Sequence, residues 1–368
     1  MRKPSPVPAA AASEQGSYRK LLDEELNGFL AEQHDLLVEV SAEALPLLDA
    51  VRGLAAGGKR LRALLSYWGW RGAGGAELDP AAVRAGVAIE LFQSAALIHD
   101  DIIDRSDTRR GGPSVHRLFS NAHSAADWHL DGAHFGSSAA ILAGDLCLSL
   151  SEEMFSAVGA RAAQGTRARR IFNRMRTEVM AGQYLDILEE VVGPTHEPQR
   201  AVVRAQNILR YKSAKYTTEH PLTLGGALAG ADEGLLEHYS RFALPLGEAF
   251  QLRDDVLGVF GDPSATGKPA GDDLREGKRT VLVAYALSTG GADVRDAIAT
   301  GLGDPGLDDD GVSRLRSVIT DTGALAATEK LIEQHSHAVF EALDQMPVDE
   351  TTRAALRALA HAAVTRSA

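Results

Sequence analysis

Three carboxylates stand close together in the segment ELFQSAALIHDDIIDRSDTRRG, which covers residues 90–111. Asp100 and Asp104 are four residues apart, so a helix would place them on one face, with Asp101 beside them. Like charges at this spacing repel each other, and a multivalent cation between them would relieve that repulsion. The candidate ligands are hard oxygen atoms with no cysteine nearby, which favours magnesium over zinc or copper. The segment therefore predicts a magnesium site.

Two arginines, Arg109 and Arg110, follow the acids and carry the planar charged groups that best match phosphate oxygens. A lone pair of aspartates is more often a solvated helix end or a cap than a binding site. Here, however, the acids follow the apolar run of residues 95–98, which should be buried, and a charge cluster at the inner end of a buried helix seldom serves solvation alone. Acids, metal and arginines together indicate a diphosphate ligand.

A second acid pair, Asp254 and Asp255, closes another apolar helix, with Gln251 one turn earlier. A segment rich in glycine, proline and serine follows and carries Lys268, and Lys278 comes after it. Such a composition is typical of a mobile loop that covers a bound anion. The acid run at 308–310 precedes a new helical pattern and is best explained as a helix N-cap.

Cationic side chains outside these segments are candidates for the same ligand. In GGKRLR, residues 57–62, the glycine pair allows close approach of the backbone to a ligand, while Lys59 and Arg62 share a helix face. A solvated cap is the alternative. Lys212 and Lys215 occur in a fairly apolar helical segment, which favours a polar cavity, although extension of both side chains to solvent is the alternative.

Helices must position these groups, because the chain of 368 residues is rich in alanine, leucine, glutamate and arginine and contains only 5% aromatic residues. We expect a disordered tail over residues 1–16, followed by one domain over 17–368, since no repeat or linker divides the rest. Apolar periodicity predicts the helical segments 18–51, 80–104, 139–158, 171–192 and 204–231, the last kinked or ended by Pro221, and amphipathic helices from 311 onward.

Composition also limits the classes of function. The net charge of −12 and the isoelectric point near 5.5 argue against a nucleic-acid-binding protein. No stretch approaches eighteen uninterrupted apolar residues and the N-terminus lacks the apolar core of a signal peptide, so we expect no transmembrane segment and a cytoplasmic location. Cys147 should be a buried, inert thiol, and His123, His129 and His134 match no metal-binding spacing.

Six blocks, in order, resemble the trans-isoprenyl diphosphate synthases, also called polyprenyl synthetases. They are GGKRLR, LIHDDIIDRSDTRRG, GQYLD, KSAKYT, FQLRDDVLG and GKPAGDDLREGKRT, and the resemblance spans about residues 20 to 365. A single DDxxD motif would be weak support, because terpene cyclases carry it too. The resemblance is greatest to geranylgeranyl diphosphate synthases.

This resemblance implies an all-α, single-domain helical bundle around a deep central cavity, and a homodimer. It implies that Asp100, Asp104 and Asp254 hold magnesium ions, with Asp101 and Asp255 assisting. The substrates would be isopentenyl diphosphate and an allylic diphosphate. The allylic diphosphate would contact Arg109, Lys212 and Lys268. Isopentenyl diphosphate would be held by Lys59, Arg62, Arg110 and Gln93, the last at a position that is often histidine in the family. The site would also be lined by Ser213, Gln251 and Lys278.

The implied reaction is head-to-tail condensation. The allylic C–O bond breaks with carbocation character, the double bond of isopentenyl diphosphate attacks, and a proton is lost, so no side-chain nucleophile is needed. The chain departs from the family pattern at Gly258, where many relatives have a third aspartate in the second acid motif. We expect activity to survive this change, with a possible difference in metal affinity or substrate order.

Product length in the family depends on side chains just upstream of the first acid motif. Ala95 and Ala96 are small, and Phe92 lies about one turn deeper, so we expect geranylgeranyl diphosphate rather than farnesyl diphosphate or a longer polyprenyl product. A terpene cyclase would normally lack GGKRLR and carry a different second metal motif. A non-catalytic synthase subunit would not be expected to keep all the acidic and cationic positions.

Overall fold

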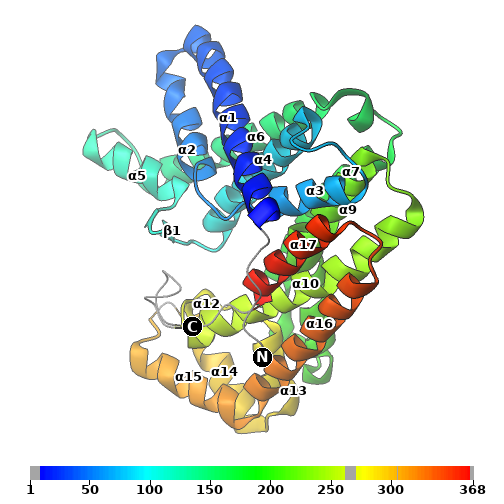
Figure 1. Cartoon of the computed structure of the whole chain (residues 1–368). Coiled ribbons are helices and arrows are strands. Elements are labelled where there is room, and N and C mark those ends of the chain that lie inside the picture. Colours follow the sequence, from blue (N-terminus) through cyan, green and yellow to red (C-terminus); the bar gives the residue numbers. More distant parts are fainter. Residues whose placement is uncertain (1–8, 262–270, 305, 365–368) are drawn as a thin grey trace.

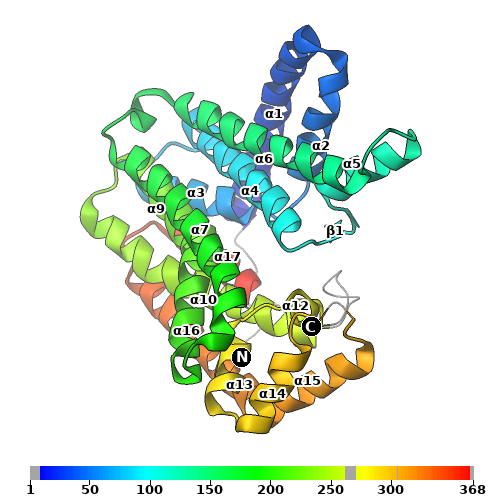
Figure 2. The same cartoon turned by 180° about the vertical axis from the view of Figure 1, so that it is seen from behind.

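The computed structural model describes residues 9–261, 271–304 and 306–364, and they are folded almost wholly into helices (Figures 1 and 2). The expected all-α class is therefore confirmed. The α-helices are α1 (Ala9–Val40), α2 (Leu45–Ala55), α3 (Leu61–Gly72), α4 (Pro80–Ile103), α5 (Val115–Ala125), α6 (Gly132–Ser156), α7 (Arg167–Val192), α8 (Ala201–Ile208), α9 (His220–Ala229), α10 (Glu233–Phe260), α12 (Asp272–Glu276), α13 (Val281–Thr289), α14 (Ala292–Gly301), α15 (Asp309–Asp321), α16 (Ala324–Gln345) and α17 (Glu350–Val364).

Short elements connect these helices. The two-residue strands β1 (Thr108–Arg109) and β2 (Gly112–Pro113) pair antiparallel directly after the first acid motif. Four 3-10 turns are η1 (Ala42–Ala44), η2 (Gly159–Ala162), η3 (Gly193–Thr195) and η4 (Pro198–Arg200), and η5 (Leu209–Glu219) is a π-helix.

The N-terminal helix corrects one prediction and refines another. Of the disordered tail predicted over residues 1–16, residues 9–16 are instead the first turns of α1, in which Ala11 is buried and Glu14 accepts hydrogen bonds from Tyr67 and Arg71 of α3. Residues 1–8 lie outside the part of the chain that the structure describes. The helix expected over 18–51 is two helices, because Ser41 ends the first and caps η1 with its hydroxyl. The sequence pattern missed this cap because apolar residues continue on both sides of it.

Helix α4 forms the centre of the bundle and packs against α3 and α6. It begins at Pro80, after the Asp79 carboxylate accepts the backbone N–H of Ala81, and it ends at the acid motif. Helices α4 and α6 are long and apolar enough to cross a membrane by length and composition alone, but 72% of the apolar window of α4 is buried inside the protein, as in the core helix of a soluble fold. The corresponding share for α6 is 39%.

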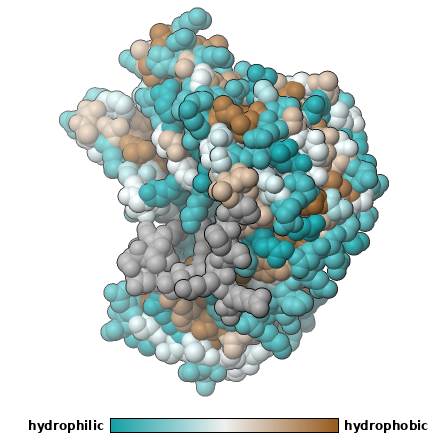
Figure 3. Space-filling model, viewed as in Figure 1, coloured by the Kyte–Doolittle hydropathy of each residue, from teal (hydrophilic) through white to brown (hydrophobic). Residues whose placement is uncertain are grey.

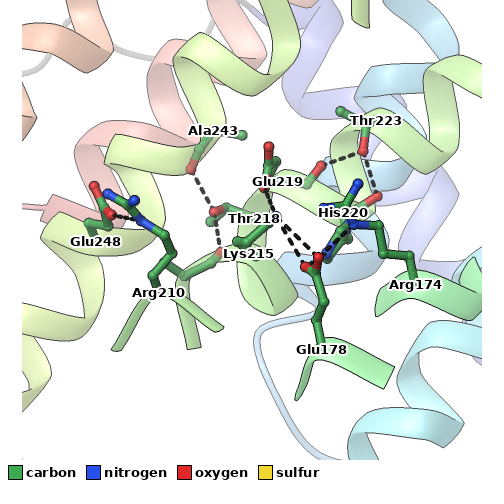
Figure 4. Close-up of polar contacts among 11 residues, drawn as sticks. Arg174, Glu178, Arg210, Lys215, Thr218, Glu219, His220, Thr223, Ala243 and Glu248 are labelled. Carbon is green, nitrogen blue, oxygen red and sulfur yellow. Dashed lines mark hydrogen bonds and ion pairs between the residues drawn. The ribbon is translucent and has the colours of Figure 1, made fainter. Parts of the chain in front are cut away.

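The segment predicted to be kinked by Pro221 passes through η5 into α9, where Pro221 occupies the first turn. The backbone N–H of His220 bonds the carbonyl of Lys215, the five-residue spacing of a π-helix. Figure 4 shows contacts that tie η5 and the start of α9 to α7: the Glu178 carboxylate lies 3.1 Å from the Lys215 ammonium of η5 and 2.8 Å from the His220 ring of α9. This network fixes the irregular turn against its neighbour.

The C-terminal part packs α10 against α16 and α17, while α13, α14 and α15 enclose a smaller apolar core that includes Val259 and Leu315. The acid run at 308–310 is a helix cap, as predicted, because the Asp308 side chain accepts the backbone N–H of Gly311 at the start of α15. Cys147 is buried, as predicted, and burial raises the pKa of its thiol to about 12. The face shown in Figure 3 is mostly hydrophilic, with scattered hydrophobic residues.

Candidate active site

Most of the predicted site residues that the structure describes meet in one cavity of approximately 1190 Å³, whose walls come mainly from α4, α7, η5 and α10. Its lining combines acids and cations with apolar side chains, among them Phe92 and Ala96. The residues with a predicted catalytic, metal-binding or substrate-binding role that line it are Lys59, Arg62, Gln93, Asp100, Arg109, Lys212, Ser213, Gln251, Asp254, Asp255 and Lys278. Asp101, Asp104 and Arg110 do not line it.

Asp100 and Asp101 face different surroundings at the end of α4. Asp100 lines the cavity, whereas Asp101 is 1% exposed and accepts hydrogen bonds from the Arg109 guanidinium, including one of 2.8 Å from Nε. The same guanidinium lies 3.8 Å from Asp100. Burial raises the pKa of Asp101, and the arginine opposes that rise. Asp101 thus holds Arg109 at the cavity wall.

Lys212 projects from η5 between acids of two other helices. Its ammonium pairs with Asp186 of α7 and lies 3.7 Å from Asp100 of α4. Burial lowers the pKa of Lys212, but Asp186, Asp100 and Asp104 together outweigh burial and raise the pKa above its ordinary value. Lys212 is therefore a permanent cation inside the cavity.

Lys278 joins the first acid motif to the segment after α10. Its ammonium lies 3.3 Å from Asp104, 3.6 Å from Asp273 and 2.5 Å from Glu276. A second link is the hydroxyl of Ser106, which donates to Glu276 at 3.0 Å. Burial and the neighbouring Asp100 raise the pKa of Asp104 to about 6, although Lys278 and Lys212 oppose them. The two acidic segments, distant in sequence, thus share one cation.

The second acid motif lies in the last two turns of α10, which continues to Phe260 and does not end at the acid pair as the sequence predicted. Asp254 and Asp255 line the same cavity as Asp100, and the Gln251 side-chain amide donates to Asp255 at 2.9 Å, one turn away. Burial raises the pKa of Asp255 to about 8; Asp273 and Asp254 add to the rise, and Gln251 opposes it.

Gly258 creates the space that Asp273 occupies. A Cβ atom on Gly258 would lie 1.8 Å from Oδ2 of Asp273, closer than any van der Waals contact. The space beside Gly258 is thus filled from α12 by the carboxylate of Asp273. The departure noted in the sequence removes a side chain from α10 without removing a carboxylate from this region.

The GGKRLR segment lies beside the second arginine of the first motif. The guanidinium of Arg110 rests on Gly57 and Gly58, where added Cβ atoms would lie 2.8 and 2.9 Å from it, and it donates to the Leu54 carbonyl at 2.6 Å. Arg110 does not itself line the cavity, whereas Lys59 does. The predicted grouping of these cations is therefore present, with Arg110 behind the glycine pair.

Next to Gln93 the cavity is lined by the apolar side chains of Phe92 and Ala96. Phe92 and Tyr216 meet edge to face, with ring centroids 5.7 Å apart, and the Tyr216 hydroxyl donates to the Gln93 side chain at 2.5 Å. Ala96 lines the cavity, but Ala95 is fully buried and points away from it. Of the two small residues, only Ala96 therefore borders the predicted hydrocarbon pocket.

The sequence pattern did not identify every residue of this region. Asp273 and Glu276 were not assigned, although they lie in the GKPAGDDLREGKRT block, and Tyr216 lies in KSAKYT without an assigned role. Lys215, which was expected at a polar cavity, instead pairs with Glu178 and Glu219. Lys268 lies outside the described residues.

The acids fit magnesium in the manner usual for diphosphate enzymes. In the part of the chain that the structure describes, no three His, Cys, Asp or Glu side chains converge closely enough to hold an ion alone. Mg²⁺ commonly takes one or two carboxylates together with substrate phosphates and water. Oδ1 of Asp100 and Oδ2 of Asp101 are buried and accept no hydrogen bond from any described residue, so oxygen ligands remain for a cation.

Comparison with known proteins supplies the family. The polyprenyl synthetase family model matches residues 46–314. The chain is 33% identical to geranylfarnesyl diphosphate synthase of Aeropyrum pernix over 83% of this chain and 89% of that protein, and 29% identical to geranylgeranyl diphosphate synthase of Saccharolobus solfataricus over 84% and 87%. The crystal structure of geranylgeranyl pyrophosphate synthase from Corynebacterium glutamicum, complexed with isoprenyl diphosphate and magnesium, superposes with a TM-score of 0.89 at 38% identity, covering 95% of this chain and 99% of that chain. The chain belongs to the polyprenyl synthetase family and is a trans-prenyl diphosphate synthase.

Proposed function

We propose that the enzyme condenses isopentenyl diphosphate with an allylic diphosphate in a magnesium-dependent reaction and that its main product is geranylgeranyl diphosphate. The observation that carries the proposal is a cavity lined by Asp100 of the first acid motif, by Asp254 and Asp255 of the second, and by the apolar side chains of Ala96 and Phe92. Relatives that make products of other lengths keep farnesyl, geranylfarnesyl and longer diphosphates as alternatives.

In this proposal each cluster of side chains has a separate task. Asp100, Asp104 and Asp254 would hold magnesium ions. Arg109, with Lys212 and Lys268, would contact the allylic diphosphate. The second diphosphate would be bound by Lys59, Arg62, Arg110 and Gln93, and Ser213, Gln251 and Lys278 would complete the lining.

The ammonium contacts of Lys212 and Lys278 support this assignment. Each ammonium already lies among several carboxylates, so both cations are held in place before a substrate arrives. Magnesium, when bound, supplies further positive charge against the departing diphosphate. Preorganised charge of this kind favours cleavage of the allylic C–O bond, because negative charge develops on the leaving oxygen.

The remaining steps depend on how the cavity walls orient the two substrates more than on reactive side chains. The apolar wall around Phe92 would hold the allylic chain, while the cations near Gln93 orient isopentenyl diphosphate so that its double bond faces the new carbocation. Loss of a proton from the condensed product, with the released diphosphate as acceptor, would end the cycle. No side-chain nucleophile takes part.

We further propose that two copies form a homodimer through α5 and α6. Ile141 and Leu142 of α6 are 46% and 58% exposed, and Trp128 and Leu130, between α5 and α6, are 52% and 96% exposed, so this part of the chain exposes several large apolar side chains. Sedimentation should give a dimer, and Leu142→Glu should shift it towards monomer; a monomeric parent protein would contradict this proposal. The expected cytoplasmic location stays a prediction, which fractionation of producing cells would test.

Product analysis tests the main proposal. Purified enzyme should be incubated separately with dimethylallyl, geranyl and farnesyl diphosphates, labelled isopentenyl diphosphate and magnesium, and the product length measured. Incorporation that stops at geranylgeranyl diphosphate is the expected result. Label that never enters a longer chain, or label found only with a second protein added, would favour a cyclase or a non-catalytic subunit.

A further inference from the structure

One cation of the GGKRLR segment has no part in the assignment above. Arg60 is only 6% exposed and caps the start of α3 with its backbone in the left-handed region, at φ 56° and ψ 30°. Residues other than glycine seldom adopt this conformation, and they keep it only where the surrounding structure fixes them. Contacts of Arg60 with its neighbours must therefore fix this backbone conformation.

Two carboxylates from other helices hold its guanidinium. Nη1 donates to Glu90 of α4 at 3.3 Å, and Nη2 donates to Asp23 of α1 at 2.8 Å. Glu90 is 7% exposed at its side chain, whereas Asp23 is 51% exposed. The pair between Arg60 and Glu90 is therefore buried, so removal of either partner would leave the other charge uncompensated.

Glu90 also reaches the start of α3. Its second carboxylate oxygen accepts the backbone N–H of Ala63 at 3.4 Å, one of the first N–H groups of that helix, which have no partner within the helix. Glu90 lies three residues before Gln93, on the same helix face. One carboxylate thus links the left-handed turn, the start of α3 and the part of α4 that carries Gln93.

The side chains on either side of Arg60 face the opposite way. Lys59 and Arg62 line the cavity, and Arg62 donates to the Thr217 hydroxyl at 2.8 Å while its guanidinium lies 4.4 Å from the centre of the Tyr216 ring. The turn is consequently clamped on its buried side by Arg60 and presents the two cations on its cavity side.

We propose that the Arg60–Glu90 ion pair is a positioning device for the site of isopentenyl diphosphate. By fixing the left-handed turn and the first turn of α3, it sets the positions of Lys59 and Arg62 relative to Gln93. This inference rests on the proposed function, since it concerns the diphosphate that those residues would hold. It assigns Arg60 and Glu90 no contact with substrate.

The chain offers a matched control for a purely structural role. Glu14 of α1 is also buried and also pairs with α3, through Arg71 at 2.6 Å and Tyr67 at 2.5 Å. Arg71 is nine residues beyond Arg62, roughly 13 Å farther along the helix. Glu14→Gln therefore disturbs the packing of α3 against a neighbouring helix without reaching the cations at the cavity.

The test compares Glu90→Gln, Arg60→Lys and Glu14→Gln in the full-length enzyme. We expect Glu90→Gln to raise the KM for isopentenyl diphosphate about tenfold, because two fixed cations lose their alignment, and to weaken calorimetric binding of isopentenyl diphosphate in the absence of metal by the same factor. The kcat and the KM for the allylic substrate should stay within about twofold. Arg60→Lys keeps the charge but loses the forked contact, so its effect should be smaller.

Glu14→Gln should lower the melting temperature as much as Glu90→Gln does and leave the KM for isopentenyl diphosphate unchanged. An unchanged KM in Glu90→Gln, or an equal rise in Glu14→Gln, overturns the proposal. If Glu90→Gln does not fold, Arg60→Lys and the exposed-side change Asp23→Asn decide, and a normal KM in both is equally negative. Failure of the proposed function would appear separately, as absence of isopentenyl incorporation by the parent enzyme.

Discussion

The sharpest test of the hydrocarbon pocket is Ala96→Phe. Ala96 borders the cavity, and Phe92 lies four residues earlier on α4, which is about 6 Å deeper along the helix axis. One isoprene unit is close to one helical turn in length. An aromatic ring at position 96 would therefore raise the pocket floor by about one unit, and we expect the main product to change from geranylgeranyl to farnesyl diphosphate.

The neighbouring residue provides the control. Ala95 is fully buried and does not border the cavity, so Ala95→Phe should overpack the core between helices, at a cost of roughly 1–3 kcal/mol in the free energy of unfolding. Its product length should not change. This replaces the expectation from sequence, which treated both alanines as floor positions.

The assay is chain-length analysis of products made from geranyl diphosphate and labelled isopentenyl diphosphate, alongside thermal unfolding. The reciprocal change, Phe92→Ala, should lengthen the product by about one unit. Shorter products from Ala95→Phe together with an unchanged product from Ala96→Phe would refute the assignment of the pocket wall.

Three further predictions concern charge and packing near the acids. Gly258→Ala would place Cβ 1.8 Å from Oδ2 of Asp273. We expect kcat in a steady-state assay to fall about tenfold, which corresponds to a rise of roughly 1.4 kcal/mol in the activation barrier. Undiminished turnover would show that Asp273 is free to move. The folded-state pKa of Asp104, about 6, lies above its ordinary 3.8, so its charge destabilises the metal-free fold above pH 6 and this cost disappears as pH falls towards 4. Asp104→Asn should accordingly be more stable than the parent by on the order of 2 kcal/mol in urea at pH 8 without metal, with no gain at pH 4, and equal stability at both pH values would contradict that sign. The pKa of Glu178 is shifted the opposite way: burial raises it, but His220 and the basic neighbours outweigh burial and lower the pKa to about 2. The ionised Glu178 therefore stabilises the fold above pH 4.5, and this stabilisation is lost as pH falls towards 2. Glu178→Gln should make the free energy of unfolding depend less on pH in that window, and a pH dependence parallel to that of the parent would argue against this.

Much of the fold was predictable because helices leave a strong periodic pattern. The start of α4 at Pro80, the cap at Asp308 and the burial of Cys147 each follow from local chemistry and match the structure. The break at Ser41 was missed because the apolar pattern of α1 continues into α2. Helical structure at residues 9–16 was missed since the alanine-rich composition gives no sign of the contact between Glu14 and α3.

The site was predictable to the extent that its residues lie in recognisable blocks. Asp100, Asp254 and Asp255 of the acid motifs and most of the proposed cations do line one cavity, whereas Asp101 and Asp104 do not. The sequence could not reveal that Asp273 fills the space left by Gly258, because that contact joins residues of two different helices. Nor could it tell which way Lys215 faces, since the geometry of a π-helix shifts every side chain relative to an ordinary helix.

Because η5 is a π-helix, the orientation of the side chains that it places at the cavity wall depends on the number of residues in this segment. A π-turn can be regarded as an α-helix with one residue inserted, so deleting a single residue between 209 and 219 would allow a more regular helix to form. A deletion between Lys212 and Tyr216 would rotate one of these side chains by about 100° around the helix axis relative to the other. In this stretch the number of residues matters as much as their identity, because the π-helical backbone aligns the side chains of two neighbouring turns at the cavity.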